Sequence, residues 1–210
     1  MEGPFSEWTG HYSPARPEPA LRVKSIIHRN DPIILAQLPF LGRGSTNHHL
    51  SHVMKAARVW NHLDSVVPGV KGAWTFSELG SMINVVISLE QKYGGHAKQA
   101  AVAALGLMSY FTKLIIVVDE DIDPSNLRHV LWAVALRSEP EEWENIKGTW
   151  SGYLDPRISP QKKEAGELTH STAIIMACKP YSWIKDFPPA VEEYPELERK
   201  VMEKWGDKLL

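Results

Sequence analysis

The stretch 114-LIIVVDEDIDP-124 decides the fold class of this chain. Residues 114–118 are apolar without interruption, which is typical of a strand that is buried on both faces of a sheet. Asp123 and Pro124 follow, and aspartate at an N-cap with proline at the first helical position predicts the start of a helix. A buried strand that leads into a helix is the repeating unit of an α/β layered fold.

The same alternation continues on both sides of this stretch. Helical spacing or β-rich composition predicts helices over 45–62, 96–108 and 191–205, and strands over 70–76, 83–89 and 172–177. The helix after Pro124 carries one apolar stripe, formed by Leu127, Val130, Leu131 and Val134. The last helix carries another, formed by Leu197, Val201 and Trp205. The alternation over residues 45–180 therefore predicts an α/β layered domain with a mixed or parallel sheet, and we assign residues 45–210 to this domain.

Residues 1–44 differ in composition from the rest. The first stretch is rich in proline and glycine, which stop helices and central strands. Residues 21–28 alternate as in a half-buried strand, and 33–36 form a second short apolar run after the turn at 30–32. Because an isolated pair of strands is marginal in water, we expect this pair to need strands from elsewhere.

Composition excludes several classes of protein. The 210 residues hold 23 basic and 25 acidic side chains, and this near-balance argues against a binder of nucleic-acid backbones. Cys178 is the only cysteine, so neither an internal disulfide nor a four-cysteine zinc site can form. No apolar run approaches the ~20 residues that span a bilayer, and the N-terminus has no signal core. We expect a cytoplasmic protein that binds neither membrane nor nucleic acid.

Two carboxylates, Glu2 and Glu7, flank the Gly3-Pro4 turn. A turn could fold both acids toward one cavity, where paired carboxylates take different pKa values and one of them serves as a general acid. The alternative is a pair of solvated glutamates near a terminus, and composition alone favours this alternative.

Metal and nucleophile sites have weaker support. His48 and His52 are one helical turn apart, but the glutamate of a His-Glu-x-x-His site is missing, so packed or solvated histidines are favoured. The acidic run 119–123 suits capping and loop solvation as well as it suits a cation. Cys178 follows a buried strand, where core packing is favoured over nucleophilic chemistry.

Eight tryptophans are many for a chain of this length. Trp8, Trp143 and Trp150 fall in predicted loops, where an indole suits a flat aromatic ligand or a subunit interface.

Several motifs together resemble one known family. Residues 2–10, EGPFSEWTG, resemble the EGPFGE-x-(T/H)-G loop of the UbiD family, the prenylated-flavin-dependent decarboxylases. Residues 118–123 with 130–133 and Arg137 resemble its DxDID … VLWA … TR segment, and 178–180 resemble its DATKP strand end. Tyr194-Pro195-Glu196 and Trp205 fit its closing segment. The resemblance covers only the C-terminal part of typical members.

The resemblance implies a divided enzyme. Prenylated FMN, with a divalent metal and potassium, would be bound mainly by a partner, an N-terminal UbiD-like cofactor-domain chain that also supplies the catalytic arginine. Residues 1–44 would complete the split β-barrel of that partner, and the C-terminal helix would serve homo-oligomerisation. The complex would be a (de)carboxylase for an aromatic or α,β-unsaturated carboxylic acid, and this chain would be inactive alone.

The resemblance also implies residue roles. Glu7 would donate the proton, and Glu2 would bridge the partner's arginine and the flavin. Tyr110 would contact the cofactor, and the substrate pocket would be lined by Trp8, Asn47, Leu50, Ser51, Trp150 and Tyr153. No metal ligand is expected in this chain.

Two departures from the family pattern matter. Ser6 replaces a glycine, which requires a negative φ there, and Leu107 stands where some members have a lysine near the cofactor, so that contact would be lost or supplied by another group.

A non-catalytic scaffold that binds sister subunits is the alternative. A scaffold needs neither Glu2 nor Glu7, so the presence of both favours the enzyme.

Overall fold

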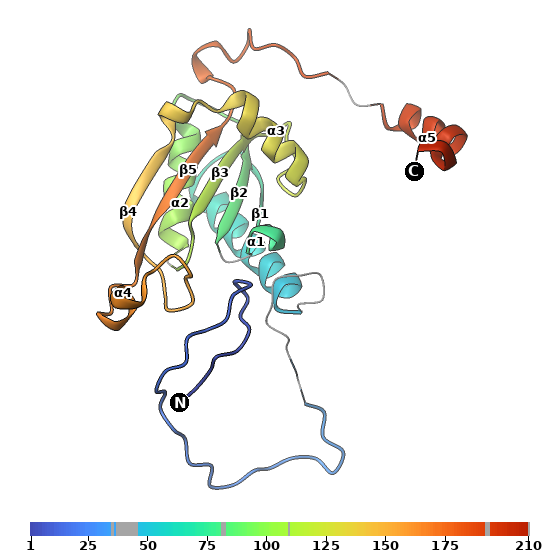
Figure 1. Cartoon of the computed structure of the whole chain (residues 1–210). Helices are drawn as coiled ribbons and strands as arrows, with labels where there is room; N and C mark the ends of the chain where they lie inside the picture. The colour runs from blue at the N-terminus through green and yellow to red at the C-terminus, as the bar shows by residue number, and fades with distance from the viewer. Residues whose placement is uncertain (35, 37–45, 81–82, 109, 192–193, 210) are drawn as a thin grey trace.

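The computed structural model describes residues 1–34, 36, 46–80, 83–108, 110–191 and 194–209 (Figure 1). Its elements follow in the order α1 (Thr46–Val66), β1 (Val70–Trp74), η1 (Ser77–Leu79), β2 (Asn84–Leu89), α2 (His96–Leu107), β3 (Leu114–Asp119), α3 (Leu127–Arg137), η2 (Pro140–Glu142), β4 (Glu144–Trp150), α4 (Pro160–Glu164), β5 (Thr169–Ala177), η3 (Tyr181–Trp183) and α5 (Pro195–Leu209). The alternation of helices and strands predicted for the region after residue 45 is confirmed.

The described strands form one mixed sheet in the order β1-β2-β3-β5-β4. β2, β3 and β5 are parallel neighbours, and β1 and β4 pair antiparallel at the two edges. β2 is buried along its whole length, and β3 is buried from Ile115 onward. Burial on both faces explains the continuous apolar sequence of these central strands.

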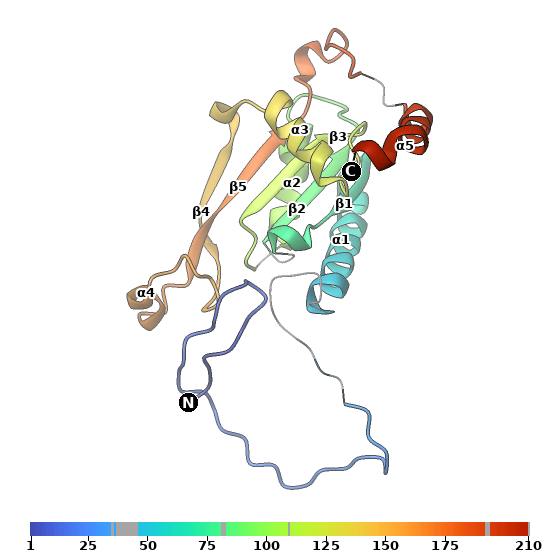
Figure 2. The same ribbon diagram turned by 45° about the vertical axis from the view of Figure 1, so that its right-hand side comes forward.

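Helices cover both faces of the sheet (Figure 2). α1 and α2 pack on one face, where Val59, Leu63 and Ala100 join a core with Ile87 and Ile115 from the strands. α3 packs on the opposite face, where its buried side chains meet those of β2, β3 and β5. The result is a three-layer α/β domain, and its small alanine side chains let α2 lie close to the sheet.

The predicted start of α3 is wrong by three residues. The helix begins at Leu127, and Asn126 is its N-cap, whose side chain accepts from the backbone N–H of His129. The Asp123 carboxylate instead accepts from the backbone N–H and the hydroxyl of Ser125. An aspartate can close such a local turn as readily as it caps a helix, and here the turn forms.

Two further predictions are corrected. Leu131 is exposed, so the buried stripe of α3 runs through Val130, Ala133 and Arg137 instead. Trp150 lies at the end of strand β4 and not in a loop. β4 is an edge strand in which Asn145, Lys147 and Gly148 interrupt the sequence, so it has no continuous apolar run to reveal it.

The predicted strands near the N-terminus do not form in the described residues. Residues 17–34 carry no strand, and Leu21, Ile27 and Ile34 are between 82% and 97% exposed. Residue 35 and residues 37–45 lie outside the described part of the chain. A strand needs a neighbour for its backbone hydrogen bonds, and no described segment lies beside this one to provide them. That these residues complete a barrel elsewhere stays a prediction.

The C-terminal helix begins at Pro195, four residues later than predicted. Its stripe of Leu197, Val201 and Trp205 is exposed to between 41% and 59%. Its role in oligomerisation stays a prediction. Within the described residues, no helix combines the length and the apolar character that crossing a membrane requires.

Candidate active site

The two glutamates lie on one arm of a folded N-terminal loop, residues 2–16. Glu2 pairs antiparallel with Arg16, and Ser6 with Tyr12, so the loop doubles back on itself. The turn at its tip is closed by the backbone N–H of Gly10, which donates to the carbonyl of Glu7 at 2.9 Å. Ser6 meets the requirement for a negative φ. Among the described residues other than glycine, a positive φ is found only at Phe111.

Trp8 docks this tip onto the α/β domain. Its side chain is 8% exposed, and its indole meets the ring of Phe111 edge-to-face at 5.0 Å. The indole also lies over the turn at Gly80, where an added Cβ would approach it to 3.8 Å. The Trp8 side chain therefore holds Glu7, its neighbour in sequence, against the domain.

Glu7 is the acid whose proton affinity the fold changes. Burial raises the pKa of its carboxyl, and the charge of Glu2 raises it further. A hydrogen bond from the backbone N–H of Trp8 and the charge of Arg16 act in the opposite direction but do not reverse the shift. Glu2 itself is exposed. Glu7 is thus half-buried with a raised pKa, and Glu2 lies in solvent.

A cavity of about 580 Å³ lies between α1 and the end of α2. It brings together Ser51 and Tyr110, two of the residues singled out from the sequence, and also Leu107. Its described lining is completed by Met54, Lys55, Arg58, Val59 and Met108. The side chains of Asn47 and Leu50 lie outside the described residues.

Aromatic contacts connect this cavity to the N-terminal loop. Tyr110 packs edge-to-face on Phe111 at 4.2 Å, and Phe111 packs in turn on Trp8. Gly152 lets these rings lie close to the segment after β4, because a Cβ there would stand 2.8 Å from Phe111 and 3.1 Å from the Tyr110 hydroxyl. Glu7 and the cavity are therefore linked through a short series of packed rings.

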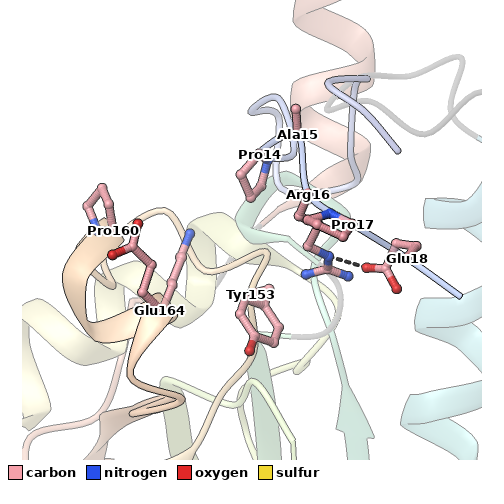
Figure 3. A pocket seen from close by; sticks show the side chains of 9 residues that line it. Pro14, Ala15, Arg16, Pro17, Glu18, Tyr153, Pro160 and Glu164 are labelled. Atoms are coloured by element: carbon pink, nitrogen blue, oxygen red, sulfur yellow. Dashed lines mark hydrogen bonds and ion pairs between the residues drawn. The ribbon is translucent and has the colours of Figure 1, made fainter. Parts of the chain in front are cut away.

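Trp150 and Tyr153 do not join that cavity. Trp150 lines a smaller cavity of about 130 Å³ with His170 and Thr172 among its neighbours. Tyr153 lines a third cavity of about 610 Å³, where the Arg16 guanidinium lies 4.6 Å from its ring centre and is paired with Glu18 (Figure 3). The predicted pocket residues thus line separate cavities in this chain.

The acidic run after β3 is a structural ion cluster. Arg137, buried on α3, binds Asp121 with both of its terminal nitrogens and Asp119 with one of them at 3.1 Å. The Lys179 side chain adds a contact to Asp121 at 2.9 Å, and these partners lower the pKa of Asp121 to about 2.

The remaining candidates have ordinary structural roles. Among the described residues, no group of three or more potential ligands could hold a metal ion. The side chain of His48 lies outside the described part, and the ring of His52 packs on Trp74. Cys178 is buried, as predicted, and its thiol pKa is raised by that burial.

Sequence reasoning missed three residues of this region. Lys55 lies one helical turn after Ser51, so the i, i+4 spacing could have placed both on one face of α1. Phe111 and Arg16 carry no sequence signal, because their contacts join segments that lie far apart in the chain.

Comparison with known proteins assigns the family. The pattern of the 3-octaprenyl-4-hydroxybenzoate carboxy-lyase (UbiD) C-terminal domain matches residues 48–177, and that of its Rift-related domain matches residues 1–41. The phenolic acid decarboxylase of Bacillus subtilis is 34% identical over 96% of this chain, which spans 43% of that relative.

Solved structures agree with this assignment. The UbiD-class enzyme HmfF from Pelotomaculum thermopropionicum, solved with FMN, has a TM-score of 0.77 at 28% identity. The match covers 94% of this chain and 42% of the HmfF chain. The closed form of Sedimentibacter hydroxybenzoicus vanillic acid decarboxylase has a TM-score of 0.73 at 30% identity. The match covers 96% of this chain and 42% of the decarboxylase chain. The chain spans less than half the length of these relatives, and it belongs to the UbiD family of carboxy-lyases.

Proposed function

We propose that this chain is the acid-bearing part of a UbiD-type (de)carboxylase for aromatic or α,β-unsaturated carboxylic acids. A second chain would hold the flavin and supply the catalytic arginine. The observation that carries the proposal is the setting of Glu7, whose carboxyl is held by the docked loop and favours its proton. The family and its named decarboxylases support the reaction class.

Glu7 can perform the step that a decarboxylase requires of its protein. When the bond to the carboxyl carbon breaks, carbon dioxide leaves and the electron pair stays on the remaining carbon. That carbon must then receive a proton, and a carboxyl that holds its proton more strongly than a free glutamate can give it. Water then returns a proton to Glu7. Glu2 is exposed, and its charge contributes to the raised pKa of Glu7.

The residues present fit part of a flavin site. Tyr110, half exposed at the cavity, offers a ring face and a hydroxyl, and the polar residues Ser51 and Lys55 stand among its apolar walls. The described residues contain no metal cluster that could anchor a flavin phosphate, so the partner would hold that end. A prenylated flavin, when bound, supplies an electron sink for breaking the carbon–carbon bond.

The exposed apolar segment before α1 supports a partner. Leu21, Ile26, Ile27, Ile33 and Ile34 are each more than three-quarters exposed. Burial of such side chains stabilises a complex by about 25 cal/mol per Å² of apolar surface removed from water. The match of residues 1–41 to the Rift-related domain supports a cofactor-domain chain as the partner.

Co-expression with a UbiD-type cofactor-domain chain tests the proposal. The purified complex should carry flavin absorbance and release carbon dioxide from an aromatic acid, and this chain alone should do neither. Flavin retained by the single chain would contradict the division of roles. A complex that forms and binds flavin, yet releases no carbon dioxide from a panel of acids, would favour the scaffold.

A further inference from the structure

Asp155 is a buried carboxylate that joins two segments of the chain. Its side chain is 1% exposed. Within its own segment it accepts hydrogen bonds from the Ser151 hydroxyl at 2.8 Å and from the backbone N–H of Arg157 at 2.9 Å. From the segment before β3 it accepts a hydrogen bond from the Lys113 ammonium at 2.7 Å. The Lys113–Asp155 pair therefore fastens residues 151–157, which follow β4, to the residues that lead into β3.

The charges of this pair follow from its surroundings. Burial raises the pKa of Asp155, but the hydrogen bonds that its carboxylate accepts outweigh burial and leave the pKa below its ordinary value. His170 on β5 faces the same carboxylate, and its Nδ1 lies 3.5 Å from Oδ2, too far for a strong hydrogen bond. Burial lowers the pKa of His170, so its imidazole is neutral at pH 7. Lys113 is therefore the cation that pairs with Asp155 at pH 7.

Phe111, two residues before Lys113, has a strained backbone conformation. Its φ is 61°, in the left-handed region that side chains other than glycine rarely adopt. Such strain persists only where the surrounding contacts determine the conformation. The backbone N–H of Lys113 donates to the carbonyl of Ile83, and the carbonyl of Lys113 accepts from the N–H of Ala173. The chain that carries the Phe111 ring is thus fixed to the sheet directly after the ring.

The segment that Asp155 fastens packs on the same ring. Gly152 leaves room for Phe111, because a Cβ at Gly152 would stand 2.8 Å from the ring. Phe111 in turn makes the edge-to-face contact with Trp8 at 5.0 Å. A shift of residues 151–157 would therefore move the surface on which Trp8 packs.

We propose that Asp155 and Lys113 are positioning residues that hold the Phe111 ring as the docking surface for Trp8. Through Trp8 they set the place of Glu7, its neighbour in sequence. The importance of docking for proton delivery rests on the proposed function. Docking itself is measured without cofactor or turnover, so the two can fail separately.

Amide hydrogen exchange of the full chain tests the pair. Lys113→Met removes the cation but leaves Asp155 its two hydrogen bonds within its own segment, so this variant should fold. The amides of Gly10 and Ser13, which close the docked loop, should exchange about 5- to 150-fold faster, the range for removing one partner of a buried hydrogen-bonded group. The amides of β2 and β3 should keep their protection.

A second readout and a matched control accompany this variant. In Lys113→Met the pKa of Glu7, which the docked loop raises, should fall toward its ordinary value. Lys98→Met, at a lysine of α2 that pairs with Glu144 on the surface, should change neither the exchange nor the Glu7 pKa.

Two double variants show whether the residues act as a pair and through Trp8. Asp155→Asn should accelerate the same exchange, and combining it with Lys113→Met should add little to the larger single effect. In a Trp8→Ala background Lys113→Met should add nothing, because the contact through which the pair acts is gone. Unchanged loop exchange in Lys113→Met, or additive effects in either double variant, would overturn the inference. Equal loss of protection in the loop and in β2 would also overturn it, because the pair would then support only the general stability of the domain.

Discussion

Replacing Trp8 by alanine should release the N-terminal loop from the domain. The indole is the buried contact at the tip of the loop, packed on Phe111 and over the turn at Gly80. Truncation of a buried tryptophan costs about 3–5 kcal/mol. Because the loop can undock while the sheet stays folded, this cost should appear as a shift of about 10²- to 4 × 10³-fold toward the undocked loop.

Amide hydrogen exchange measures that shift directly. In the Trp8→Ala variant, the amides that close the loop, those of Gly10 and Ser13, should exchange faster by that factor, while amides of β2 and β3 keep their protection. Burial and the charge of Glu2 raise the Glu7 pKa in the docked loop. Undocking should lower the Glu7 pKa, and an NMR titration that follows the chemical shift of the Glu7 carboxyl carbon measures this change.

The sign of the pH effect follows from the same shift. Docking raises the Glu7 pKa. At a pH between the pKa values of the undocked and the docked loop, the docked loop therefore binds more protons than the undocked loop. Docking is therefore favoured at low pH and weakens as the pH rises through the pKa of the docked loop. Trp60→Ala, at an exposed indole on α1, is the control and should change neither readout. Unchanged exchange of Gly10 and Ser13 in Trp8→Ala would refute the anchoring role.

Two further substitutions test the packing around the site. Arg137→Met leaves Asp119 buried without its main cation. In urea titrations this variant should lower the free energy of unfolding by about 3–5 kcal/mol. The control, Arg128→Met at an exposed position of the same helix, should change the free energy of unfolding by less than about 0.5 kcal/mol. Equal effects of the two arginine variants would contradict the ion-cluster account. Gly152→Ala places a Cβ 2.8 Å from Phe111 and should cost about 1–3 kcal/mol by the same measurement, and an unchanged midpoint would show that the aromatic contact is looser than described.

The central fold was predictable because its signals are local. The apolar run of β3 reflects burial on both faces, and the helical spacing of α1 and α2 reflects one covered face each. The start of α3 was missed because Asp123 closes a turn, an alternative that the same residue supports equally well. The edge strand β4 was missed because its exposed positions carry no apolar run.

The site was predictable only in part. The family resemblance singled out Glu7 and Ser51, and the structure places Ser51 in the lining of the cavity. Lys55 was missed because a lysine in a helix usually reaches solvent, and its burial depends on α2 packing beside α1. The family resemblance grouped Trp150 and Tyr153 with the pocket, but in this chain they line other cavities.

The most direct test of the central claim is proton delivery by Glu7. The reconstituted complex, supplied with its cofactor and an aromatic acid in deuterated water, should place one deuterium on the carbon that loses carbon dioxide. Glu7→Gln keeps the size of the side chain but has no acidic proton, so it should lower both deuterium incorporation and turnover by about 10²–10⁴-fold while flavin binding and complex formation persist. Near-normal deuterium incorporation and turnover in Glu7→Gln would contradict the account.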